Sequence, residues 1–370
     1  MKPSDRFIPI SEPLLAGNEL NYVTEAVTSG WISSLGKYIP QFEQGFADFC
    51  GTTHGIAVNN GTTALHLALL ALGIGPGDEV IVPTFTFIAT ANAVHYTGAT
   101  PVFADSEAET WNIDPAEIAR LITPRTKAVI PVHIYGHPAN MDPILALARQ
   151  HGLHVIEDAA EAHGALYKGK RVGSLGEINT FSFYGNKIIT TGEGGLLTTN
   201  DDALDQKVRF LRDHAMSTEK RYWHTEIGYN YRMTNLQAAV GVAQMERIEE
   251  FIARKRQNAR IYNQGLKDVP FIQTPPEASW ATSVYWMYSI LLAKDFPLDR
   301  DEVMKRLHAQ GIDSRPFFYP IHVQPPYQQP FSLPVSEDLS RRGINLPSAV
   351  TLSEEDIQRI VAALKSMGKK

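Results

Sequence analysis

Short apolar runs alternate with longer segments of helical spacing between about residues 51 and 200. Such alternation is typical of an α/β fold, in which crossover helices cover a sheet. Seven runs are predicted to form the strands of one large mixed sheet: 56–58, 80–82, 101–104, 128–132, 154–158, 180–183 and 195–199. Segments rich in Ala, Leu and Ile between them predict helices over 62–72, 88–96, 115–121 and 143–151.

The remainder of the chain predicts a second, smaller unit. Thr234 and Gln237 have the spacing of a capping box, so a helix should begin there and run past Glu250. Gly, Pro and Ser accumulate over 262–285, and the chain beyond reads as an α+β unit that ends in a helix over 353–365. We therefore expect a large domain over residues 1–250 and a small domain over 251–370. Residues 1–35 contain a predicted amphipathic helix over 17–28, and this segment could pack on either domain.

Composition excludes several classes of protein. Hydrophobic residues make up 44% of the 370 positions and charged residues 20%, as in folded globular proteins. The formal charge of −6 has the wrong sign for gripping nucleic-acid phosphates, so no nucleic acid is expected as a partner. A single cysteine, Cys50, forms no internal disulfide, which favours a reducing compartment and hence the cytoplasm. No apolar run reaches the length of a membrane span, and the first residues lack the apolar core of a signal peptide.

Two motifs resemble known sites but fail on detail. The stretch from Gly30 to Lys37 is one residue too long for a phosphate-binding P-loop, and Tyr38 stands where Ser or Thr would hold magnesium. His133 and His137 have helical i,i+4 spacing, yet Gly136 and the proline after His137 argue against a helix there. We therefore expect no metal site.

Four separated segments together point to an aldehyde cofactor such as pyridoxal phosphate. Such a cofactor needs a lysine amine, a phosphate cradle, a carboxylate and a surface for its ring. Lys187 supplies the amine in a polar, glycine-rich stretch, although most loop lysines are simply solvated. Asp158 ends a strand at the sheet edge where α/β folds bind ligands, or alternatively caps the helix that follows.

The phosphate cradle and the ring surface come from two further segments. Gly61 and Thr62 open a helix after a strand, where free amides favour a phosphate, unless Asn60 is simply an N-cap. Ser182 could add its hydroxyl to the same phosphate. Phe87 is the candidate for stacking on the ring, with core packing as the alternative.

The electronics of the cofactor assign the two central roles. Lys187 would tether the aldehyde as a Schiff base and, once released, move a proton between the substrate carbon and the cofactor. Asp158 would accept the pyridinium N–H, because a nearby negative charge favours the protonated ring that withdraws electrons.

At these residues the sequence resembles the sugar aminotransferase family of fold-type I pyridoxal phosphate enzymes. The resemblance runs from Trp31 to Ser348 and is strongest over 180–195, 228–235 and 315–322. It implies a mostly parallel seven-stranded sheet and matches Lys187 and Asp158 to the roles above. It places Glu161 where many relatives have a glutamine near the cofactor's hydroxyl. It also implies that Asn230 reaches the phosphate across the interface of a homodimer with two shared sites.

The resemblance implies transfer of the amino group of glutamate to C4 of a nucleotide-linked 4-keto-6-deoxy sugar used for surface polysaccharide. GDP-4-keto-6-deoxymannose is the favoured substrate, and UDP- or dTDP-linked sugars are the alternatives. A binding or regulatory protein that lost catalysis is a further alternative, against which Lys187 and Asp158 both argue. The candidates for holding the nucleotide and sugar are cationic or aromatic: Arg221, Arg315, Lys37, Trp31, Trp223, Tyr319 and His322.

Overall fold

The large predicted sheet is present in the computed structural model, which describes residues 6–368. Its seven strands lie in the order β1-β9-β8-β5-β4-β2-β3, and all but β9 run in the same direction. Strand β9 is antiparallel to both β8 and β1, so the sheet is mixed but mostly parallel, as predicted. Each predicted strand is confirmed: β1 His54–Val58, β2 Glu79–Pro83, β3 Thr100–Ala104, β4 Thr126–Val129, β5 His154–Asp158, β8 Ile178–Ser182 and β9 Gly195–Thr199.

Helices cover both faces of this sheet because its strands alternate their apolar side chains between the two sides. In β2, Val80 and Val82 pack toward α3, α4 and α7, whereas Ile81 packs toward α6. The helices predicted from periodicity are confirmed to within two residues. The helices of this part are α2 Tyr38–Cys50, α3 Gly61–Ala71, α4 Ala89–Tyr96, α5 Pro115–Leu121, α6 Met141–His151 and α7 Asp202–Arg212.

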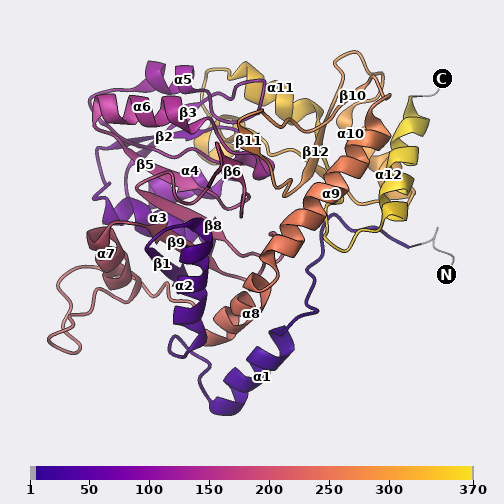
Figure 1. Ribbon diagram of the computed structural model, residues 1–370. Helices are drawn as coiled ribbons and strands as arrows, with labels where there is room; N and C mark the ends of the chain where they lie inside the picture. The colour runs from indigo at the N-terminus through magenta and orange to yellow at the C-terminus, as the bar shows by residue number, and fades with distance from the viewer. Residues whose placement is uncertain (1–5, 369–370) are drawn as a thin grey trace.

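The C-terminal part contains a smaller antiparallel sheet in the order β10-β12-β14-β13. The helices α9, α10 and α12 supply much of its core (Figure 1). A further small sheet pairs β11 (Ala281–Thr282) with β6 (Leu166–Tyr167) and so links the two parts of the chain. The elements here are α9 Ile248–Leu266, β10 Ile272–Gln273, β12 Tyr288–Leu292, α10 Arg300–Ala309, β13 Arg315–Pro316, α11 Pro334–Arg342, β14 Gly343–Leu346 and α12 Glu354–Met367.

The long helix predicted from Thr234 past Glu250 is wrong in one respect. Its capping box is confirmed, but α8 (Asn235–Met245) ends before α9 begins at Ile248. Arg247 has φ −121°, which interrupts the helical backbone between them. The domain boundary predicted near residue 250 falls in the first turn of α9, and the division into domains stays a prediction.

The N-terminal segment contacts both parts of the chain. Ile8 pairs with Ile312 and joins the C-terminal core, whereas α1 (Glu19–Ser29) packs against α8. Over residues 6–368, no helix is both long enough and apolar enough to cross a bilayer.

Candidate active site

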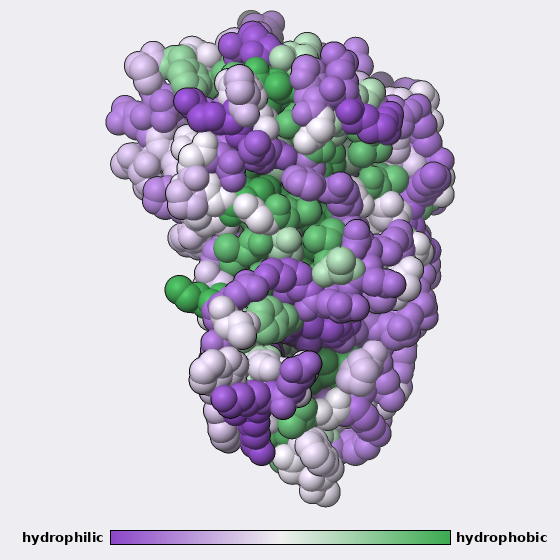
Figure 2. Space-filling model, turned by 90° about the vertical axis from the view of Figure 1, so that its left-hand side faces the viewer, coloured by the Kyte–Doolittle hydropathy of each residue, from purple (hydrophilic) through white to green (hydrophobic). Residues whose placement is uncertain are grey.

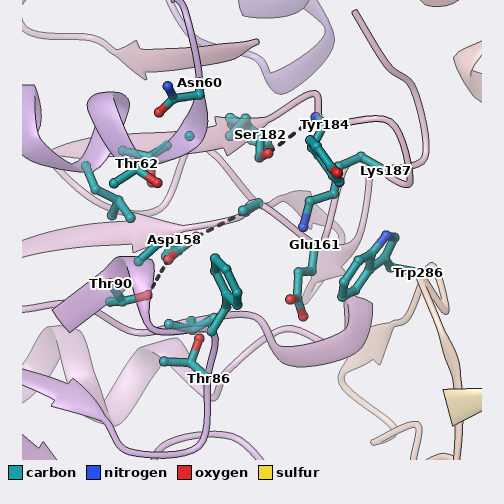
Figure 3. Close-up of a pocket in the computed structure, with 18 of the residues that line it drawn as sticks. Asn60, Thr62, Thr86, Thr90, Asp158, Glu161, Ser182, Tyr184, Lys187 and Trp286 are labelled. Atoms are coloured by element: carbon teal, nitrogen blue, oxygen red, sulfur yellow. Dashed lines mark hydrogen bonds between the residues drawn. The ribbon is translucent and has the colours of Figure 1, made fainter. Parts of the chain in front are cut away.

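A cavity of about 570 Å³ opens at the carboxyl edge of the large sheet. Strands β5 and β8, the start of α3 and the loop after β2 supply one side. The C-terminal part adds two aromatic walls, Trp286 (Figure 3) and Phe318. The side chains that matter for its chemistry are Asn60, Thr62, Phe87, Thr90, Asp158, Glu161, Ser182, Lys187, Trp286 and Phe318.

The start of α3 lies directly against β8. Asn60 caps the helix by accepting a hydrogen bond from the Thr63 amide at 2.9 Å, and this cap does not involve the two amides before Thr63, so it is compatible with a phosphate there. The first amides of a helix have no partner within it, which leaves those of Gly61 and Thr62 free of intrahelical bonds at the cavity edge. A Cβ on Gly61 would lie 2.8 Å from Cβ of Ser182, so only glycine allows this approach. The arrangement suits a phosphate held by amides and a hydroxyl.

Asp158 is held in place by two donors at the end of β5. Its Oδ2 accepts a hydrogen bond from the Thr90 hydroxyl at 2.8 Å, and its Oδ1 accepts one from the Ala160 amide at 3.2 Å (Figure 3). Burial raises the pKa of the carboxyl, whereas Thr90, Ala160 and the charge of Lys187 favour the ionised form. A buried carboxylate held in this way can accept a hydrogen bond from a protonated ring nitrogen.

Lys187 lies on the connection between β8 and β9, and its amine projects into the cavity (Figure 3). Backbone hydrogen bonds fix this connection: the Phe183 amide donates to the Gly194 carbonyl, and the Thr191 amide donates to the Phe183 carbonyl. Nζ lies 4.0 Å from the centre of the Trp286 ring. Desolvation lowers the pKa of Lys187, while the charges of Glu161 and Asp158 raise it. A lowered pKa makes the neutral, nucleophilic amine more available.

Glu161 adds a second carboxyl group to the same cavity. It is buried, and its Oε2 accepts a hydrogen bond from the Tyr135 amide at 2.7 Å. Burial raises its pKa to about 7, against the opposing effects of Lys187 and the Tyr135 amide. Glu161 can therefore be neutral or charged in this cavity, whereas a glutamine is always neutral.

The structure brings most of the predicted cofactor residues together. Lys187, Asp158, Glu161 and Ser182 line the cavity with Gly61, Thr62 and Phe87. Phe87 is 57% exposed, so the alternative that it packs in the core is wrong. Asn230 lies outside the lining, where its side-chain oxygen accepts a hydrogen bond from Arg232, and its role across a subunit interface stays a prediction.

The seven residues predicted to bind nucleotide and sugar do not line this cavity. His322 is the clearest correction: it is buried, and its ring nitrogens bond to Thr84 and Glu337, which leaves neither for a substrate. Four of the others are exposed but already paired or stacked: Lys37 with Glu25, Arg315 with Asp313, Tyr319 with Arg300 and Trp223 with Lys220. Trp31 and Arg221 are exposed away from the lining.

Thr90, Trp286 and Phe318 are among the lining residues that were not predicted from sequence. Thr90 lies in the first turn of α4, after the loop that carries Phe87, and no motif marks its hydroxyl. Trp286 and Phe318 come from the C-terminal part, from which the sequence predicted other residues, Arg315, Tyr319 and His322, as substrate contacts. The nearest signal was the aromatic stretch around Tyr319, whose neighbour Phe318 is the residue that faces the site.

Comparison with known proteins agrees with this geometry. The model of the DegT/DnrJ/EryC1/StrS aminotransferase family matches residues 13–365. The chain belongs to this family. The GDP-perosamine synthase of Caulobacter vibrioides is 53% identical over 96% of this chain and 97% of its own length. The GDP-perosamine synthase of Escherichia coli O157:H7 is 49% identical over 95% of this chain and 96% of its own.

Solved structures of the family superpose closely on this chain. S. venezuelae DesV, crystallised in complex with a ketimine intermediate, has a TM-score of 0.92 and 36% identity, with 99% of this chain and 100% of that chain covered. The aminotransferase from Psychrobacter cryohalolentis also has a TM-score of 0.92, with 34% identity and coverage of 97% and 98%. The protein is a pyridoxal phosphate-dependent sugar aminotransferase, and the amine, carboxylate, helix start and aromatic face of its cavity fit that cofactor.

Proposed function

We propose that this enzyme transfers the amino group of glutamate to C4 of GDP-4-keto-6-deoxy-D-mannose. The product is GDP-perosamine, a precursor of bacterial surface polysaccharide such as O-antigen. The similarity to GDP-perosamine synthases from three bacteria, each over at least 95% of this chain, supports this substrate. The cavity that contains both Lys187 and Asp158 supports the chemistry.

The residues of the cavity divide the work of this transfer. When bound, pyridoxal phosphate supplies an aldehyde that carries the amino group and a ring that withdraws electrons. The Lys187 amine would hold the cofactor at rest and, when free, would move a proton at the reacting carbon. Asp158 would accept a hydrogen bond from the ring N–H, with its ionised form favoured by Thr90. The Ser182 hydroxyl and the amides of Gly61 and Thr62 would hold the phosphate.

We further propose that the enzyme works as a homodimer in the cytoplasm. In each site, Asn230 of the partner subunit would contact the phosphate. Outside the cavity lining, the protein exposes large apolar side chains that include Leu35, Tyr222 and Ile227. Figure 2 shows apolar residues gathered across the middle of one face of the molecule, between polar regions. Such a surface favours contact with a second copy of the chain.

Sugar specificity is tested by offering glutamate with GDP-, UDP- or dTDP-linked 4-keto-6-deoxy sugars and measuring 2-oxoglutarate release. We expect turnover with the GDP-linked sugar to exceed the others. Equal turnover on all three sugars would overturn the assignment to GDP-perosamine, and preference for a UDP- or dTDP-linked sugar would support the alternative substrates.

The role of Lys187 is tested by Lys187→Ala. We expect the variant to retain its circular dichroism spectrum but release no 2-oxoglutarate, because the cofactor loses both its tether and its base. Ordinary turnover in this variant would refute the role given to the lysine.

A further inference from the structure

Trp286 and Phe318, the two aromatic residues of the C-terminal part that line the cavity, both pack against one short turn. This turn, residues 133–137, follows the end of β4 and belongs to the large-sheet part, whereas Trp286 and Phe318 belong to the C-terminal part. The Gly136 carbonyl accepts hydrogen bonds from the Val284 amide and the Ser283 hydroxyl at 3.0 and 3.1 Å. A Cβ on Gly136 would lie 2.8 Å from the Trp286 nitrogen, so the two backbones touch.

Tyr135, at the centre of this turn, contacts both walls. Its ring stacks on Phe318 with centroids 5.3 Å apart and lies nearly parallel to Trp286 at 6.4 Å. Its hydroxyl accepts a hydrogen bond from the Phe318 amide at 3.0 Å. Trp286 in turn donates its indole N–H to the Asn186 carbonyl at 2.8 Å and covers the Lys187 amine.

Tyr135 has a strained backbone conformation, and its amide hydrogen-bonds to a cavity residue. Its φ is +51° and ψ is 17°, a left-handed conformation that costs a residue with a bulky side chain about 1–2 kcal/mol. This conformation accompanies an amide that donates to Glu161 at 2.7 Å. Strain of this kind persists where the surroundings hold it, and it clusters at functional sites.

We propose that Tyr135 is a positioning residue that fixes the aromatic walls of the C-terminal part relative to Glu161. The Tyr135 hydroxyl bonds to Phe318, and its ring lies beside the ring of Trp286. The Tyr135 amide donates to Glu161 and so favours the ionised form of that carboxyl group. The charge of Glu161 faces Lys187, so a loose Tyr135 alters both the fit of the sugar and the protonation of the lysine. Titratable groups around Glu161 are Lys187 and Asp158 in the cavity and Tyr135 itself.

The test compares Tyr135→Phe with Tyr262→Phe. Tyr262 is a matched control, because it is also buried, stacks on Tyr288 and donates its hydroxyl to the Pro347 carbonyl at 3.0 Å, outside the cavity lining. Both variants lose one buried tyrosine hydrogen bond, so a purely structural role predicts the same behaviour for both.

Two measurements on the cofactor-loaded enzyme decide the outcome. In Tyr135→Phe we expect KM for the keto sugar to rise about five-fold with kcat within about two-fold, the size of one lost hydrogen bond. We also expect the pH midpoint of the absorbance of the lysine-linked cofactor to fall by about 0.5. The amide of residue 135 remains in this variant, but the turn loosens without the bond to Phe318, so that amide supports the charge of Glu161 less well. In Tyr262→Phe neither value should move.

The other possible results each contradict part of the proposal. Identical behaviour of the two variants would overturn the proposal, and a raised KM without a shifted midpoint would overturn the link to Glu161. The sugar assay rests on the proposed function, whereas the absorbance titration needs only the cofactor. Failure of the GDP-linked sugar as a substrate therefore leaves the titration able to decide.

Discussion

Thr90 illustrates how a neutral side chain sets the charge of a catalytic group. Asp158 is buried, which disfavours the carboxylate that the ring nitrogen requires. The Thr90 hydroxyl, 2.8 Å from Oδ2, is the largest influence in the opposite direction. The carboxylate is therefore maintained by a residue that has no charge of its own.

Replacing Thr90 with valine keeps the shape of the side chain and removes its hydroxyl. We expect the pKa of Asp158 to rise and turnover to fall roughly ten-fold, the value of a hydrogen bond to a charged group. The nitrogen-15 resonance of a labelled cofactor ring should move toward that of a neutral pyridine. Thr90→Ser should restore most of the loss, and normal values in Thr90→Val would show that another group maintains the charge.

Glu161→Gln tests the second carboxyl group of the cavity. The charge of Glu161 raises the pKa of Lys187, so its removal should lower that pKa. The apoenzyme variant should therefore bind pyridoxal phosphate covalently faster at pH 7, by up to about ten-fold if the pKa of the lysine falls by about 1. The rate of absorbance gain from about pH 6 to about pH 9 measures this. Glu193→Gln, at the exposed rim of the cavity, is the control and should behave as the wild type.

At the scale of elements, the close approach of α3 and β8 shapes the phosphate end of the cavity. Gly61→Ala places a Cβ 2.8 Å from Cβ of Ser182, so helix and strand must separate. We expect the dissociation constant of pyridoxal phosphate to rise several-fold, roughly the loss of one hydrogen bond.

Gly45→Ala is the matched control for this substitution. Gly45 lies in α2 with open space around its Cβ, so alanine should raise the free energy of unfolding by up to about 1 kcal/mol and leave cofactor affinity unchanged. Unchanged cofactor affinity in both variants would mean that the spacing of α3 and β8 does not govern phosphate binding.

The sequence predicted the elements better than their ends and junctions. The sheet strands are apolar runs with a strong local signal, and the capping box of α8 is a local hydrogen-bond pattern. The break at Arg247 has neither glycine nor proline to mark it, because packing rather than local preference changes φ there. Tyr319 was chosen where Phe318 faces the cavity, and an error of one residue in an extended segment turns a side chain to the opposite side.

At the scale of the molecule, Lys255 lies buried between segments that meet behind the active site. Its Nζ donates to the carbonyls of Trp286 and Ser348 at 2.9 and 2.6 Å. Burial lowers its pKa to about 7. The neutral amine still has two N–H groups, so loss of the proton costs neither hydrogen bond.

Lys255 should therefore make the protein more stable as the pH rises. Between about pH 7 and about pH 10 the unfolded lysine binds a proton that the folded one does not, so the free energy of unfolding should increase by up to about 1.4 kcal/mol per pH unit. Lys255→Met should lack this increase when unfolding is followed by urea titration. Lys267→Met, exposed at the end of α9, is the control, and parallel pH profiles in all three proteins would refute the assignment.

Only one side of the cavity could be predicted from the sequence. The residues of that side lie at strand ends of one sheet, whereas those of the other side come from the C-terminal part of the chain. Lys187, Asp158 and the start of α3 lie at the ends of strands in one sheet, where topology brings them together. Trp286 and Phe318 arrive through the docking of the C-terminal part, which depends on contacts such as those of Gly136 and Tyr135. A single sequence carries no local pattern for that docking.

The divided origin of the cavity has a practical use in engineering. The groups that handle the amine come from the sheet edge, and the aromatic walls come from residues 283–286 and 317–318. Chimaeras that exchange these two stretches with those of other family members should keep the cofactor reaction and alter which sugars are accepted. Mutant libraries aimed at new amino sugars are best confined to them.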